Sequence, residues 1–129
     1  MSEQEIIVSL QRAYAAMSRG DFDTAVEIAD PDITVVTPLS TLRGADEFRA
    51  WMEPTTIENP SIEPESFEFA GNDVLVRHHA RGRGVASGIR IDAKFWTIWT
   101  FNEAGLATRV VGFRDDEESK ARRAAGLSE

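Results

Sequence analysis

Two adjacent histidines, His78 and His79, are the side chains of this sequence best suited to acid–base chemistry. A histidine changes charge near neutral pH, so one that faces a cavity can serve as a general acid or base. His78 falls in a run, 74–83, in which apolar and polar residues alternate. Neighbouring side chains of a strand point to opposite faces, which places His78 on the apolar side with Val74 and Val76. We predict His78 as the catalytic candidate; the structural alternative is a half-buried histidine with an ordinary hydrogen-bond partner.

His79 points to the opposite face, so the two histidines cannot chelate one metal ion from a regular strand. A β-bulge would reverse that facing. Asp92 is a carboxylate in the middle of a long predicted strand, and the same alternation places it outward. There we expect a salt bridge to one of the nearby cations Arg77, Arg90 or Lys94. We predict no metal site.

Several further side chains are predicted to line an interior cavity. Hydroxyl groups there can orient a ligand, although hydroxyls satisfied within a plain core are the alternative. Aromatic walls fit a flat or apolar ligand, and they fit an ordinary core as well. The predicted ligand-binding residues are Tyr14, Thr37, Trp51, Phe67, Phe69, Phe95, Thr97 and Trp99.

The helices that position these residues are predicted from apolar spacing. Residues 3–19 place apolar side chains three and four positions apart, and Ser2 with Glu5 forms a capping box at the start. The other predicted helices are Phe22 to Ala29, Gly44 to Met52, and a C-terminal helix from Asp116 that Gly126 ends.

The rest of the chain alternates in the manner of β-strands. We predict a short strand at 33–37, a loop at 53–61 where two prolines fall, and four longer strands at 62–70, 74–83, 88–101 and 106–114. Three helices, one strand and a long meander give an α+β class. With 129 residues and no linker, we expect a single domain over 1–129.

Charge and composition exclude several classes of function. The net charge of −8 argues against nucleic acid or an anionic membrane as partner. The N-terminus carries acids where a signal peptide carries positive charge, and no apolar run approaches a membrane span. The absence of cysteine suits a reducing compartment, so we expect a cytoplasmic protein. No cofactor motif is present, and we expect no cofactor.

The outward face of the predicted sheet carries an apolar patch. A contiguous exposed patch of this kind usually marks an interface. We therefore predict a homodimer that packs through the outer sheet face, with Trp96, Ile98, Val111 and Phe113 at the contact.

Three segments resemble nuclear transport factor 2-like proteins, in particular their SnoaL-like and ketosteroid isomerase-like branch. They are QRAYAAMSRGDFDTAVEIADPDITVVTPLSTLRGADEFRAWM, FWTIWTFNEAG and VVGFRDDEESKARRAAGL. The resemblance covers nearly the whole chain. It implies a cone-shaped fold in which three N-terminal helices wrap a curved, mixed or antiparallel sheet over a pocket, with a further C-terminal helix. Many members are homodimers.

The catalytic sets of the family do not carry over. Where the isomerases place an aspartate base before the proline of the first strand, this chain has Thr37. Their oxyanion-hole tyrosine corresponds to Ala13, one step from Tyr14, and their protonated aspartate to Thr97. Limonene epoxide hydrolase-like enzymes use an Asp-Arg-Asp set. The nearest match here is Arg77 with His79, and the late aspartate position falls near Gly112, so this set is missing as well. SnoaL-like cyclases pair an aspartate with a histidine, and here no inward carboxylate is predicted.

Two functions follow as expectations. The first is a pocket protein that binds a small apolar organic molecule and isomerises, cyclises or hydrates it, with His78 as acid or base. The second is a non-catalytic ligand-binding or dimerisation module of the same fold. A carboxylate within hydrogen-bond reach of His78 would favour the first; its absence would favour the second.

Overall fold

A computed structural model describes residues 2–53 and 57–128. The first helix, α1 (Glu3–Ser18), begins with the predicted capping box between Ser2 and Glu5 and buries Leu10, Tyr14 and Met17. Its apolar stripe is therefore confirmed as the face that packs on the sheet. The predicted second helix divides into a short α-helical part and a 3-10 turn, and Ala29 already belongs to the first strand.

Strands and helices follow the predicted order, with one strand added. The elements after α1 are α2 (Phe22–Ala25), η1 (Val26–Ile28), β1 (Ala29–Val36), β2 (Thr41–Arg43), α3 (Ala45–Met52), β3 (Ile57–Ala70), β4 (Asp73–Gly84), β5 (Arg90–Phe101), β6 (Ala107–Arg114), η2 (Asp115–Glu117) and α4 (Glu118–Ala125). Gly126 ends α4 in the left-handed conformation, as predicted. Among the described residues, no helix has the length and apolar character needed to cross a membrane.

The six strands form one curved, unclosed sheet in the order β2-β1-β6-β5-β4-β3. The long strands β3 to β6 pair antiparallel as a meander, while β1 pairs parallel to β6, so the sheet is mixed. The α+β class is confirmed. The strand β2 is new: it pairs antiparallel to β1 through a tight turn and spans only three residues, too few to give a periodic pattern.

The predicted loop at 53–61 is partly wrong. Residues 54–56 lie outside the described residues, but 57–61 form the first part of β3. Pro60 and Pro64 are tolerated because β3 is an edge strand, whose outward N–H groups have no ladder partner. Register shifts beside both prolines, and a left-handed Asn59, bend the strand there.

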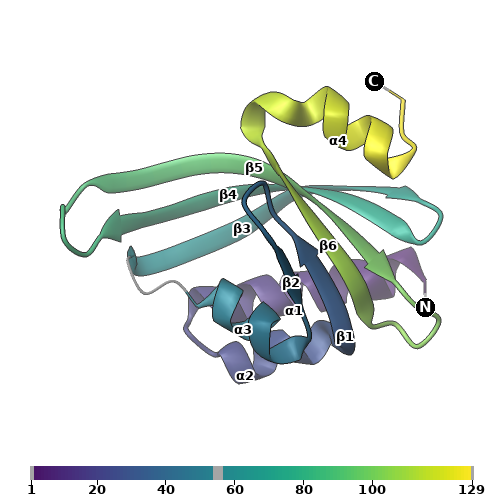
Figure 1. The fold of residues 1–129 in the computed structure, drawn as a ribbon, viewed down its shortest axis with the longest axis horizontal. Coiled ribbons are helices and arrows are strands. Elements are labelled where there is room, and N and C mark those ends of the chain that lie inside the picture. The colour runs from purple at the N-terminus through teal and green to yellow at the C-terminus, as the bar shows by residue number, and fades with distance from the viewer. Residues whose placement is uncertain (1, 54–56, 129) are drawn as a thin grey trace.

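The two faces of the sheet carry separate cores. Helices α1 to α3 cover one face, and α4 lies across the other (Figure 1). Under α4, the side chains of Leu75, Trp96, Ile98 and Phe113 pack against Ala121 and Ala125, with Val111 partly buried beside them. The patch that we predicted as a dimer interface is thus covered by the chain's own C-terminal helix. The prediction of an exposed patch is wrong because sequence alternation does not reveal which later element returns to cover a face.

Placing a charge beneath α4 is expected to release this helix and make the chain self-associate. Ala121 is fully buried against the outer face, so Ala121→Asp forces a carboxylate into an apolar contact that costs several kcal/mol. Light scattering should then report a larger mass than for the unchanged chain. Ser119→Asp, on the exposed side of the same helix, is the matched control and should leave the mass unchanged. Equal masses for both variants would contradict the role of α4.

Candidate ligand-binding cavity

A cavity of about 240 Å³ that opens to the surface lies between the sheet and helices α1 and α3. For comparison, an apolar cavity of about 150 Å³ suffices to hold benzene. Strand β5 contributes one side of the cavity through side chains that alternate inward, and the 57–62 end of β3 contributes another. The wall consists of Tyr14, Met17, Trp51, Met52, Ile57, Pro60, Ser61, Ile62, Ala80, Arg81, Ile91, Phe95, Thr97 and Trp99.

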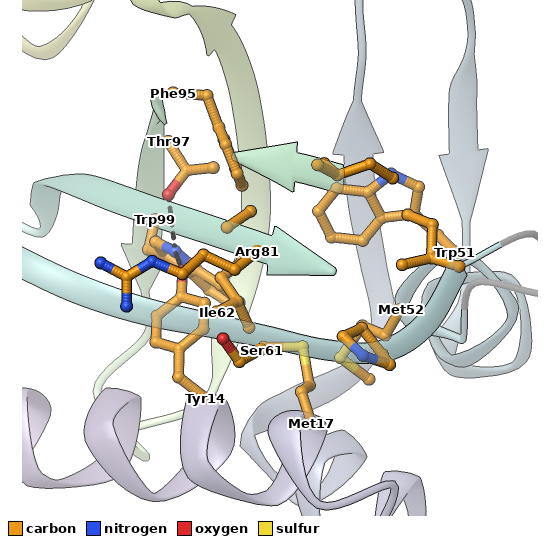
Figure 2. A pocket seen from close by; sticks show the side chains of 14 residues that line it. Tyr14, Met17, Trp51, Met52, Ser61, Ile62, Arg81, Phe95, Thr97 and Trp99 are labelled. Atoms are coloured by element: carbon orange, nitrogen blue, oxygen red, sulfur yellow. Dashed lines mark hydrogen bonds between the residues drawn. The ribbon is translucent and has the colours of Figure 1, made fainter. Parts of the chain in front are cut away.

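The cavity has an apolar end and a polar end. Figure 2 shows Tyr14, Thr97 and Trp99 together on one side, with Trp51 and Met52 across from them. Trp51 is 38% exposed, so the cavity approaches the surface at that side. Tyr14, Thr97 and Trp99 are buried. Arg81, which is also exposed, belongs to the same wall.

Three side chains at the polar end are joined by hydrogen bonds. The indole Nε1–H of Trp99 donates to the Tyr14 hydroxyl oxygen at 2.9 Å and to Thr97 Oγ1 at 3.0 Å. Tyr14 also lies edge-on to the Trp99 ring, with the ring centroids 6.0 Å apart. Trp99 can only donate, so both hydroxyl oxygens act as acceptors toward it.

His78 lies behind this polar end and is fully buried. Its Nε2 contacts Thr97 Oγ1 and lies 3.3 Å from the Tyr14 hydroxyl oxygen, and its ring stacks on Phe95 with centroids 4.6 Å apart. Among the described residues, Nδ1 has no hydrogen-bond partner, and no charged neighbour acts on the pKa of the ring. Burial without a compensating charge lowers the pKa of His78 from 6.5 to about 3. The ring is neutral at physiological pH.

Tyr14 is neutral as well. Burial raises the pKa of its hydroxyl above the ordinary value of 10.0, and the hydrogen bonds with Thr97 and Trp99 only partly oppose this shift. The polar end therefore offers neutral hydroxyl groups in a largely apolar wall, in which Arg81 is the charged residue among those described.

The structure brings five of the predicted ligand-binding residues together in the wall: Tyr14, Trp51, Phe95, Thr97 and Trp99. The inward direction of His78 agrees with the predicted alternation, but the side chain lies behind the wall and is not part of it. His78 therefore does not contact the cavity directly, as an acid or base acting on a bound ligand would have to.

Three predicted positions fall elsewhere. Thr37 follows the end of β1 and closes the turn to β2: its hydroxyl donates to the Ser40 carbonyl at 3.1 Å and accepts the N–H of Leu39. Phe67 and Phe69 do face inward, yet they pair with Val76 and Val74 at the far end of the sheet and pack on the core there. None of the three belongs to the described cavity wall.

Several wall residues were missed by the sequence reasoning. Met17, Ala80 and Ile91 follow the same helical and strand periodicities that found their neighbours, so their pattern could have identified them. Pro60 and Ser61 could not be found, because their segment carries the signals of a loop.

On the outer face, Asp92 is confirmed as outward, but its partner differs from those expected. Its carboxylate contacts His79 Nε2, and Arg81 donates to the other ring nitrogen of His79 at 3.1 Å. Arg77 pairs instead with Asp115. The described residues contain no group of three or more His, Asp or Glu side chains placed to hold a metal ion.

Solved structures match this fold over 84% to 97% of the chain. One is an NTF2-like protein of unknown function from Burkholderia pseudomallei, 24% identical, TM-score 0.76, covering 97% of this chain and 98% of the other. A second is a putative SnoaL-like polyketide cyclase from Jannaschia sp. CCS1, 16% identical, with a TM-score of 0.77, which covers 97% of this chain and 94% of the other. A third, from Mycobacterium tuberculosis, was solved with estradiol-17beta-hemisuccinate: 12% identity, TM-score 0.71, covering 84% and 92%.

At such identities the likeness shows the fold, and the expected nuclear transport factor 2-like cone is confirmed. No curated protein matches the chain. The sequence itself matches the SnoaL-like domain over residues 10–110, most of the chain. The protein belongs to the SnoaL-like domain family.

Proposed function

We propose that this protein binds a small, largely apolar organic molecule in the cavity, with an oxygen of the ligand directed at Tyr14 and Thr97. The observation that carries the proposal is the wall itself: fourteen residues, mostly aliphatic or aromatic, with buried hydroxyls gathered at one end. Pockets of this composition take apolar ligands, and their few polar groups fix orientation. The steroid-bound relative of the same fold is consistent with such a ligand.

Binding is supported over acid–base catalysis by what surrounds the polar end. Removal or delivery of a proton at neutral pH needs a group that titrates there and reaches the ligand. The described wall contains no Asp, Glu or His, and the pKa of the buried His78 lies at about 3. These features favour the non-catalytic module over an isomerase or cyclase that uses His78 as its acid or base.

Filling the cavity is expected to block binding. Ala80 lies in the wall, and Ala80→Phe adds a ring to a space of about 240 Å³. The neutral bicyclic ketone 2-acetylnaphthalene is a suitable probe, because it is apolar and carries one acceptor oxygen. Its affinity, measured by equilibrium dialysis, should fall by about tenfold or more, equivalent to 1.4 kcal/mol or more.

Ala124→Phe is the matched control. Ala124 lies on the exposed side of α4, the helix that covers the opposite face of the sheet, and is outside the described wall. Its variant should bind 2-acetylnaphthalene as the unchanged chain does. If Ala80→Phe folds and binds the probe with unchanged affinity, the ligand does not occupy this cavity and the proposed function fails.

A further inference from the structure

His78 is the buried titratable group that the proposed function leaves without a role. It does not touch the cavity, and its ring is held between Phe95 and Tyr14. Within the described residues, only Nε2 has polar neighbours, the hydroxyls of Thr97 and Tyr14. A ring with one partnered nitrogen cannot pass a proton on from one side to the other. The side chain can therefore act only through hydrogen bonds between Nε2 and these two hydroxyl groups.

The tautomer of His78 follows from the cost of the two alternatives. A proton on Nδ1 would leave a buried N–H donor without a partner among the described residues, which proteins rarely accept. A proton on Nε2 finds a hydroxyl oxygen as acceptor and leaves only an unpaired lone pair on Nδ1. The second arrangement satisfies every hydrogen of the ring.

With this tautomer, two N–H groups converge on two hydroxyl oxygens. Nε2–H of His78 donates to Thr97 Oγ1, and Nε1–H of Trp99 donates to the Tyr14 oxygen and to Thr97. His78 lies outside the cavity wall, and Trp99 belongs to it. One hydroxyl can donate to the other. The described residues offer no further acceptor to the remaining hydroxyl hydrogen, which leaves it to a ligand. Accepting hydrogen bonds also strengthens a hydroxyl as a donor.

We propose that His78 is a positioning residue: together with Trp99 it holds the Thr97 and Tyr14 hydroxyls as hydrogen-bond donors, so that the cavity selects ligands whose buried end is an uncharged acceptor oxygen. This inference rests on the proposed binding function and names the ligand class of the same site. Ketones, ethers and esters satisfy it. Hydrocarbons leave a buried donor unpaired, and groups that only donate oppose the donors already present.

The tautomer is tested directly by nitrogen NMR of the unchanged chain. The His78 ring should show a protonated Nε2 and an unprotonated Nδ1 near neutral pH. A protonated Nδ1 with an unprotonated Nε2 would overturn the proposal, because His78 would then accept a hydrogen bond at Nε2 and would not donate one to the Thr97 hydroxyl oxygen.

The selection is tested with two probes of nearly equal shape, 2-acetylnaphthalene and its hydrocarbon analogue 2-isopropenylnaphthalene. His78→Phe keeps a ring against Phe95 but removes the N–H, and His78→Gln restores an N–H donor at a similar distance along the side chain. The preference for the ketone should fall by roughly tenfold in His78→Phe, the worth of one hydrogen bond, and return in His78→Gln. The affinity for 2-isopropenylnaphthalene should be the same in both variants as in the unchanged chain. A variant that merely lost its structure would bind both probes more weakly.

The outcomes separate the two proposals. If neither probe binds the unchanged chain, the proposed function fails and this inference fails with it. If both probes bind and their affinity ratio is the same in the unchanged chain and both variants, the cavity binds ligands but His78 does not position its donors. That second outcome overturns the inference and leaves the proposed function standing.

Discussion

Acidification from about pH 7 to pH 4.5 is expected to lower the unfolding free energy of the unchanged protein by roughly 2–3 kcal/mol more than that of His78→Gln. The reason is the burial of His78, which lowers its pKa from 6.5 to about 3 in the folded chain. Above pH 6.5 the ring is neutral whether the chain is folded or not, and it adds no pH dependence. Below 6.5 the unfolded chain binds a proton that the folded chain does not. Stability therefore falls with pH across the window from 6.5 to about 3.

The measurement is urea unfolding at the two pH values, compared between variants. His78→Gln removes the titrating ring while keeping an N–H donor, so its stability should vary less with pH. His79→Gln is the matched control: the neighbouring His79 side chain lies on the outer face beside Asp92, and its replacement retains His78. That control should lose stability on acidification as the unchanged chain does. An equal loss in His78→Gln would show that His78 is solvated or paired with a charge.

Tyr14→Phe is expected to abolish the preference for a ketone over its hydrocarbon analogue. Tyr14 is 2% exposed, and its hydroxyl is the polar group that α1 contributes to the cavity wall. Loss of the hydroxyl removes a hydrogen bond to the ligand oxygen, worth roughly 1–3 kcal/mol in a buried site. The affinity for 2-acetylnaphthalene, measured by equilibrium dialysis, should fall about tenfold or more. The affinity for 2-isopropenylnaphthalene should hold, because the hydrocarbon accepts no hydrogen bond from Tyr14.

Met17→Leu provides the comparison for this variant. Met17 also lies on α1 and in the cavity wall, but it carries no hydrogen-bond donor. Replacement by a side chain of similar volume should change both affinities alike. A Tyr14→Phe variant that loses affinity for both probes equally would mean that Tyr14 acts by packing, and the hydrogen-bond account would be wrong.

Most of the fold could be predicted from the sequence, because the patterns that indicate its helices and strands are local. The stripe of α1 and the alternation of β4 and β5 arise from residues close together in the chain, and each was confirmed. The start of β3 was missed because Pro60 and Asn59 are local breakers, tolerated only because the strand lies at an edge of the sheet. Helix α4 covers the outer face because the chain folds back across the sheet after β6, and no local sequence pattern predicts this.

The cavity wall could be predicted from the sequence where it follows a strand. Alternation placed Phe95, Thr97 and Trp99 on one side, and all three line the cavity. The same alternation oriented His78 correctly but could not reveal its environment, because Tyr14, 64 residues away, supplies one of its neighbours. Thr37 was misplaced because β1 ends one residue before it, and the turn that follows takes up its hydroxyl.

The central claim is that this cavity binds an apolar molecule through hydroxyl donors at its buried end. The two affinities of the unchanged chain test it most directly. Equilibrium dialysis should show 2-acetylnaphthalene bound about tenfold more tightly than 2-isopropenylnaphthalene, the difference expected for one buried hydrogen bond. Equal affinities for the ketone and the hydrocarbon, or no binding of either probe, would contradict the claim.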